Sequence, residues 1–262
     1  MMTQGQSSSF LMKQDDVLDT VADWHHRVLF SLSDKLSSNS EFPCLFSKNA
    51  FAKGLLLFLF VEGTSSPDIR KLAEGLADYV KLSSEWNGSL NTAYPLIIAF
   101  SLRAIESGSI EDYDTFGWEI LQRLHEIDPR PWPAAVGKDA NAASWSMCFN
   151  GMPLFCNMCH PAHQQRRSRN LGEHFLIVVN PRERFDIVAG DTPAGRKVRT
   201  NIRARIERFD GIPHCPQLAP YGSGALEWWQ YSVADENVER TDKCPFAYMV
   251  SGIPRPSMIA EP

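Results

Sequence analysis

Apolar residues follow two different patterns along the chain, one helical and one extended. In four segments they recur every three or four positions, as on the buried stripe of an amphipathic helix. In five others they form short, nearly continuous runs, as in buried strands. The expected helices begin near residues 15, 66, 109 and 192, and the expected strands span 55–61, 94–100, 145–149, 152–158 and 174–180.

Capping residues support each of these helix starts. The aspartates at 15 and 16 can cap a first helix whose apolar stripe would run from Val17 through Val21 to Leu32. Pro67 fits the first turn of the second helix, and Ser109 opens a capping box for the third. Thr192-Pro193 opens the last helix in the same way.

Turn residues mark a hairpin and two loops. Asn150-Gly151 separates two apolar runs and supplies the positive φ angles of a tight hairpin turn. A proline-marked loop is expected over 41–46, and proline-, glycine- and aromatic-rich loop is expected beyond Gly211. The order strand, helix, strand, followed by a hairpin, predicts a mixed α/β (α+β) fold with helices packed on a mixed sheet.

The chain length suits a single domain. At 262 residues, with no internal repeat and no low-complexity linker, we expect one catalytic domain over 15–250. We expect the segments 1–14 and 251–262 to be tails, the first of them disordered and polar.

Composition is that of an ordinary globular protein, with 44% hydrophobic and 22% charged residues. The net charge of −5 gives no reason to expect nucleic acid or an anionic membrane as partner. The longest apolar stretch, 54–61, is far shorter than the ~20 residues of a membrane span. The first residues do not resemble a secretory signal, so we expect a cytoplasmic protein whose six cysteines are reduced.

A dense Cys/His cluster, Cys156-x-x-Cys159-His160-x-x-His163, allows three interpretations. The C-x-x-C-H spacing is that of covalent haem attachment, which normally needs an exported protein. The four side chains are also zinc ligands, but they fall within eight residues, which makes a tetrahedral site cramped. In the third interpretation one histidine at a strand end ligates a non-covalent haem. In the remaining alternative these residues bind no metal or cofactor, and the cluster consists of buried cysteines beside surface histidines.

Cys44 and Cys244 are the other notable thiols. A cysteine thiolate can ligate haem iron and favour O–O cleavage, but cysteine is also among the most buried residue types. Spacing alone leaves both interpretations open.

A helix near the C-terminal end carries a run of basic residues. Such a run could read nucleic acid. Because the apolar positions keep helical spacing and the whole chain is acidic, a solvated helix face is the favoured interpretation. The six basic residues are Arg196, Lys197, Arg199, Arg203, Arg205 and Arg208.

The fingerprints of nucleotide enzymes are absent from the sequence. There is neither a G-x-G-x-x-G after a strand nor a P-loop, and no G-x-S-x-G elbow. An oxygenase built on this chain would therefore take electrons from a separate protein, a small reductant or peroxide.

Several sequence blocks together resemble the YqcI/YcgG family. They run in the family's order from about residue 42 to 246, which is most of the chain. The blocks are Phe42-Pro43-Cys44 with Lys48, Ala50 and Gly54; Leu121-x-x-Leu-His125-x-x-Asp128 before Trp132; Cys148-Phe149-x-Gly151; His160-Pro161 with Ser168-Arg169; Asn180-Pro-Arg with Phe185; Glu227 with Gln230-Tyr231; and Cys244-Pro-Phe246. The C-x-x-C-H spacing and the second histidine at 163 depart from the family's pattern.

The resemblance implies a function, because some members of the family are haem proteins that N-hydroxylate guanidino groups in natural-product pathways. Others have no assigned activity. It implies haem b as cofactor, dioxygen or peroxide chemistry, and arginine or an arginine-derived small molecule as substrate. The rival functions are a non-catalytic haem carrier or sensor and a zinc-stabilised interaction protein.

The resemblance also implies roles for individual residues. His160 would be the axial ligand of the iron, with His163, Cys44 and Cys244 as competitors. Arg166 and Arg169 would pair with the haem propionates as bidentate donors. Glu227 would hold the substrate guanidinium, because a planar cation matches a planar carboxylate.

Overall fold

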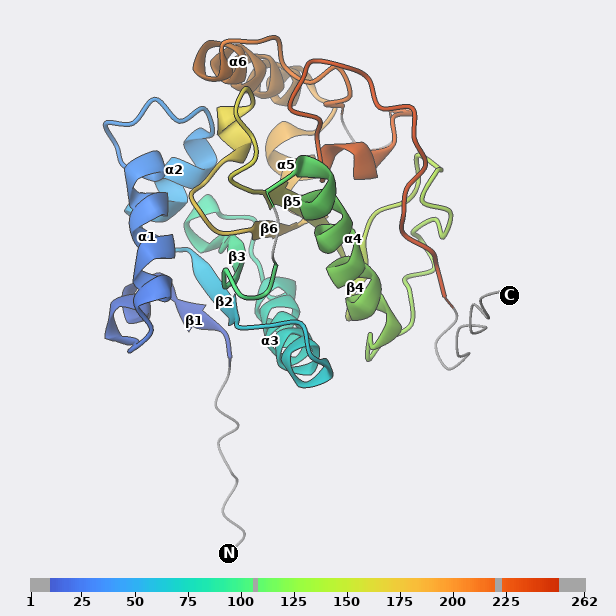
Figure 1. The fold of residues 1–262 in the computed structure, drawn as a ribbon. Helices are drawn as coiled ribbons and strands as arrows, with labels where there is room; N and C mark the ends of the chain where they lie inside the picture. Colours follow the sequence, from blue (N-terminus) through green and yellow to red (C-terminus); the bar gives the residue numbers. More distant parts are fainter. Residues whose placement is uncertain (1–9, 106–107, 220–222, 250–262) are drawn as a thin grey trace, which may run out of the picture.

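A mixed sheet with strand order β1-β2-β3-β6-β5-β4 forms the centre of the molecule (Figure 1). The structure is a computed structural model that describes residues 10–105, 108–219 and 223–249. The strands are β1 (Met12–Lys13), β2 (Leu57–Val61), β3 (Leu96–Phe100), β4 (Cys148–Phe149), β5 (Met152–Cys159) and β6 (Leu176–Pro181).

Both predicted strand connections are confirmed. β2 and β3 are parallel neighbours joined through a helix, in the predicted order strand, helix, strand. β4 and β5 form the predicted hairpin, with Asn150 at φ 50° and Gly151 at φ 80°. β6 lies antiparallel between β3 and β5, so the sheet is mixed. The mixed α/β fold class is therefore confirmed.

Helices cover both faces of this sheet. Because side chains alternate along a strand, β3 sends Leu96 and Ile98 into one core and Ile97 and Ala99 into another. The first core is closed by α3 and α4, and the second is bounded by α1 and α2 (Figure 1). The helices are α1 (Asp23–Leu36), α2 (Leu45–Ala52), α3 (Ser66–Ser84), α4 (Ile110–Glu126), α5 (Arg182–Ala189) and α6 (Pro193–Asp210).

Three of the predicted helix starts are confirmed by capping hydrogen bonds, although the cap of α3 is Ser65, which was not predicted. Ser65 and Asp68 form a complete capping box at α3, and Ser109 caps α4 by accepting the Asp112 N–H. Thr192 caps α6 through the Gly195 N–H. Local sequence fixed these starts because the cap and its helix lie within one turn of each other.

The prediction of one continuous helix from residue 15 is wrong. The chain forms a 3-10 turn over Gln14–Asp19, then breaks, and α1 begins only at Asp23. Thr20 stops the turn, because its backbone is extended and its hydroxyl donates to the Val17 carbonyl at 2.8 Å. Val21, expected on the buried stripe, is consequently fully exposed.

Three elements were not predicted. α2 begins inside the expected 41–46 loop, α5 follows β6 directly, and β1 pairs with β2 inside the expected N-terminal tail. The fold thus already includes Met12 and Lys13, whereas 1–9 and the expected tail at 251–262 lie outside the described residues. Over the described ranges, no helix is long and apolar enough to cross a membrane.

Candidate functional site

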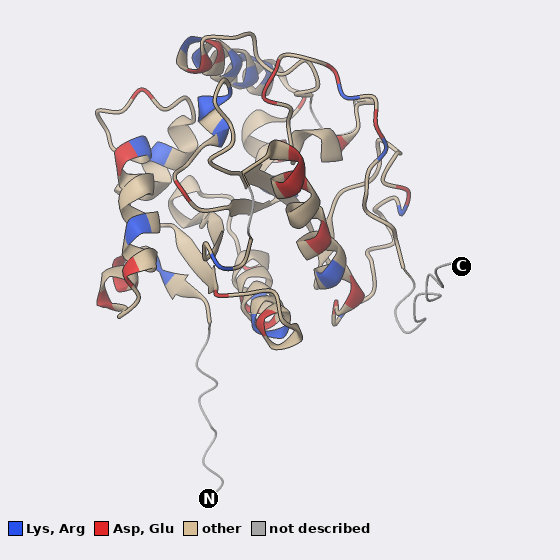
Figure 2. Ribbon diagram, in the orientation of Figure 1, with Lys and Arg blue, Asp and Glu red and all other residues tan. Residues whose placement is uncertain are grey.

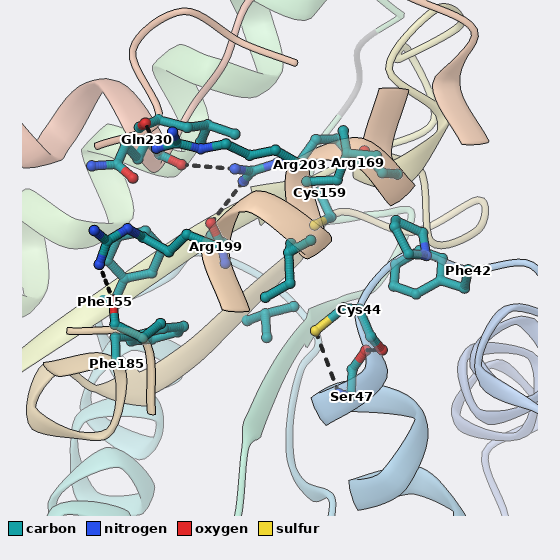
Figure 3. A pocket seen from close by; sticks show the side chains of 18 of the residues that line it. Phe42, Cys44, Ser47, Phe155, Cys159, Arg169, Phe185, Arg199, Arg203 and Gln230 are labelled. Carbon is teal, nitrogen blue, oxygen red and sulfur yellow. Dashed lines mark hydrogen bonds between the residues drawn. The ribbon is translucent and has the colours of Figure 1, made fainter. Parts of the chain in front are cut away.

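A cavity of about 340 Å³ lies on the sheet face that carries α1 and α2 (Figure 3). Side chains of β5 alternate between the two faces of the sheet. Asn157 and Cys159 therefore line the cavity, while Cys156 and Met158 point into the core on the opposite face. α1 and the start of α2 bound one side, and α5 and α6 bound the other. Most of the wall is apolar, and the volume falls in the range of small-molecule and cofactor sites, ~300–1,000 Å³.

The Cys44 thiol faces this cavity from the N-terminus of α2 (Figure 3). Its Sγ accepts the Ser47 backbone N–H at 3.5 Å, and the amino end of a helix favours negative charge. Arg205 of α6 fixes the preceding segment, because its Nε donates to the Pro43 carbonyl at 2.9 Å and its Nη2 to the Phe42 carbonyl at 3.4 Å. Two distant elements therefore hold Cys44 in place.

Four arginines line the cavity: Arg169, Arg182, Arg199 and Arg203. Arg169 donates to Asn157 Oδ1 at 2.8 Å and to the Gln230 carbonyl at 3.0 Å. Arg199 and Arg203 of α6 hold the carbonyls of Gly190, at 2.7 Å, and of Leu218. Arg169 was a sequence candidate, but Arg199 and Arg203 were not, because the basic helix was interpreted as a solvated face.

Glu227 lines the same cavity, although only 4% of its surface is exposed. Its Oε1 accepts hydrogen bonds from Ser146 Oγ and from the Tyr231 hydroxyl, both at 2.6 Å. Burial raises the pKa of Glu227 to about 7, against the lowering effect of these bonds and of the nearby Arg182. The cavity therefore holds a carboxyl group that titrates near neutral pH.

The structure places His160 and His163 away from this cavity. His160 is fully buried at the end of β5, stacked between Tyr113 and His163 with ring centroids 4.8 and 4.1 Å apart. Burial lowers the pKa of His160 to about 3, so it is neutral, and neither ring nitrogen has a hydrogen-bond partner among the described residues. His163 Nδ1 lies 3.3 Å from Asp235, whose carboxylate also accepts three backbone N–H groups.

Arg166 and Cys244 also lie outside the cavity lining. Arg166 is buried and binds the carbonyls of Ala234, Pro213 and Glu236, so it holds the C-terminal segment of the described chain. Cys244 packs against the core on the opposite face of the sheet, and burial raises its pKa to about 12.

The zinc and covalent-haem interpretations of the Cys/His cluster are wrong. Cys156 and Cys159 are three residues apart on one strand, so their thiols enter the cores on opposite faces of the sheet. They cannot converge on one metal or one haem edge. Within the residues that the structure describes, no group of three or more His, Cys, Asp or Glu side chains could hold a metal ion.

Comparisons with known proteins agree with the sequence blocks. The model of the YqcI/YcgG family matches residues 32–247. DcsA of Streptomyces lavendulae, whose name provisionally describes it as an N(omega)-hydroxy-L-arginine synthase, is 54% identical over 94% of this chain and 93% of its own. YcgG and YqcI of Bacillus subtilis (strain 168), both named as uncharacterized, are each 31% identical, over 93% and 95% of this chain and 94% and 96% of their own.

No solved structure matches the chain significantly. The family model nevertheless covers most of the sequence, and the relatives match almost end to end. The chain belongs to the YqcI/YcgG family.

Proposed function

We propose that the protein is a haem-dependent monooxygenase that N-hydroxylates the guanidino group of arginine or of an arginine-derived small molecule, in a natural-product pathway. The observation that carries the proposal is the composition of one cavity, which is lined by the Cys44 thiol, four arginines and the buried Glu227 carboxyl group. The name of DcsA, at 54% identity, supports the same reaction.

The residues of the cavity fit haem b. Of the four candidate ligands, Cys44 is the one that lines the cavity, so it replaces His160 as our proposed axial ligand. Arg169, Arg199 and Arg203 line the same space and would pair with the propionates. Once bound there, haem would supply the activation of dioxygen or peroxide, a chemistry that side chains alone do not offer.

The proposed reaction needs electrons from outside the chain. One oxygen atom of dioxygen enters an N–H bond to give N–OH, and the other leaves as water. This balance consumes two electrons and two protons, which an external electron donor and water would supply. With hydrogen peroxide as oxidant, no further electrons are needed.

Glu227 would bind the substrate guanidinium. Its carboxylate must be ionised for this role, and a bound cation lowers the pKa of a neighbouring carboxyl group. Ser146 and Tyr231 hold the carboxyl group through Oε1, and the apolar wall around it excludes water. The chain itself thus binds and orients the guanidino group.

A spectrum and a product assay test the proposal. Protein loaded with haem should show a Soret band that shifts on addition of arginine, and should form hydroxyarginine with reductant and dioxygen, followed by mass spectrometry. Cys44→Ser should change the spin state or empty the site, whereas His160→Gln and Cys244→Ser should not. An unchanged Soret band in Cys44→Ser would refute Cys44 as the axial ligand. Haem binding without formation of hydroxyarginine would instead favour a haem carrier or sensor.

A further inference from the structure

Helix α6 carries basic residues on both of its sides, and the two sets have different surroundings. The three half-buried arginines at 199, 203 and 205 bind backbone carbonyls around the cavity. Arg196, Lys197 and Arg208 are instead exposed, and Arg196 forms an ion pair with Asp191 at 2.8 Å. With the exposed Arg167, whose guanidinium lies 5.1 Å from the Phe209 ring at the end of α6, these residues form a surface that we call the basic face.

The middle of the basic face carries short side chains. Lys197 and Arg208 are eleven residues apart, which places them on the same side of an α-helix and roughly 16 Å from each other. The exposed positions between them are Thr200, Asn201 and Ala204, whose side chains are short and uncharged. A partner's surface can therefore approach the helix closely between two positive ends.

The charge of α6 contrasts with that of the whole protein. The chain has a net charge of −5, whereas α6 holds six basic and two acidic residues (Figure 2). The two acidic side chains are occupied: Asp210 accepts from Ser168 at 2.8 Å, and Glu207 lies 2.6 Å from His214 Nδ1. Asp191 neutralises part of this charge through Arg196, but the helix keeps a positive excess. A positive surface on an acidic protein favours encounter with an acidic partner.

We infer that the basic face docks an acidic one-electron carrier protein, of the iron–sulfur or flavin class, which delivers the two electrons of the reaction one at a time. This inference rests on the proposed function. The inner side of α6 lines the cavity, so a carrier on the basic face would stand about one helix diameter, ~10 Å, from it. Figure 3 shows Arg199 and Arg203 of α6 at that inner side.

Binding of a defined carrier tests the surface without any turnover. The probe is an acidic plant-type [2Fe–2S] ferredoxin, titrated by calorimetry into the full-length, haem-loaded protein. Its Kd should rise with ionic strength, and the double variant Lys197→Glu/Arg208→Glu should weaken binding by about tenfold or more. The matched control is Arg70→Glu/Lys71→Glu, which reverses two exposed charges on α3, across the sheet.

Turnover separates the two proposals. With ferredoxin, its reductase and dioxygen, the KM for ferredoxin should rise about tenfold in the double variant. With hydrogen peroxide, the rate should not change. Three results would overturn the docking proposal. They are an equal loss of ferredoxin binding in the control double variant, an unchanged ferredoxin Kd in Lys197→Glu/Arg208→Glu, and binding of a DNA duplex to the basic face as tight as that of ferredoxin. A wild-type protein that forms no hydroxyarginine from either source would instead overturn the proposed function.

Discussion

The protonation of the Glu227 carboxyl group is coupled to the stability of the fold. Its pKa is raised from 4.5 to about 7 by burial, so between these values the folded protein binds more protons at this site than the unfolded chain does. The contribution of Glu227 to the free energy of unfolding should therefore fall as pH rises from about 4.5 to 7, by up to ~3 kcal/mol. The buried His160 and His163, whose pKa values are lowered, act in the opposite direction, so the difference in urea unfolding between the wild type and Glu227→Gln from pH 4.5 to 8 measures this contribution.

Glu227→Gln should remove the contribution of Glu227 and leave that of the other buried groups. The amide oxygen can still accept both bonds that Oε1 accepts from Ser146 and Tyr231, and it cannot ionise. The variant should therefore be more stable than the wild type above pH 7. Glu183→Gln, at an exposed position on α5, serves as control and should keep the wild-type pH dependence. Identical slopes in all three proteins would place the titration elsewhere.

The same carboxyl group should make substrate binding depend on pH. Arginine affinity should increase as pH rises towards and through about 7, because only the ionised Glu227 attracts a guanidinium. Glu227→Gln should bind arginine at least tenfold more weakly at pH 8, as expected for a lost buried charge contact of ~1.5–3 kcal/mol. Calorimetric titration at several pH values decides, and an unchanged Kd in the variant would remove Glu227 from the substrate site.

At the scale of elements, Arg205 links α6 to the segment that presents Cys44. Replacing it by glutamine removes two hydrogen bonds to the carbonyls of Phe42 and Pro43. We expect haem affinity to fall several-fold and the Soret band to broaden, while the melting temperature of the cofactor-free protein changes little. Arg208→Gln, exposed on the same helix, should leave the haem titration as in the wild type. A loss of equal size in both variants would mean that α6 acts only through its charge.

The sequence pattern located some helices and missed others, and the number of apolar residues that each helix buries explains the difference. α3 and α4 each bury a long apolar stripe, so periodicity and caps located them. α2 buries only Ala50 and α5 only Arg184, so neither has a stripe to detect. Both unpredicted helices help to wall the cavity, together with α1 and α6. Local pattern therefore located two of the four helices around the cavity and missed the other two.

At the scale of the whole molecule, the two faces of the sheet are covered differently. One face is filled by α3 and α4, and the other is hollowed between α1, α2, α5 and α6. The site joins residues from positions 44, 169, 199, 203 and 227, which only strand order and helix placement bring together. The family's sequence blocks named Cys44, Arg169 and Glu227 as candidates. They could not show that Cys44 lines the cavity and His160 does not, because this depends on the face of the sheet that each side chain enters.

Arg166 binds the C-terminal segment of the described chain at several points. Its buried guanidinium reaches carbonyls of Pro213, Ala234 and Glu236 and the Asn237 side chain, so it joins parts of the chain that follow α6 to the end of β5. Arg166→Met would leave these acceptors unpaired.

We expect Arg166→Met to lower the free energy of unfolding by about 3 kcal/mol or more, because a buried charged donor to several acceptors is lost. Its neighbour Arg167, which is exposed, gives the matched control: Arg167→Met should cost under ~1 kcal/mol. Urea unfolding followed by tryptophan fluorescence reports the segment directly, because Trp228 and Trp229 lie within it. If both variants unfolded like the wild type, the segment would be held by its apolar contacts, with Trp228 and Tyr231 as the residues to replace next.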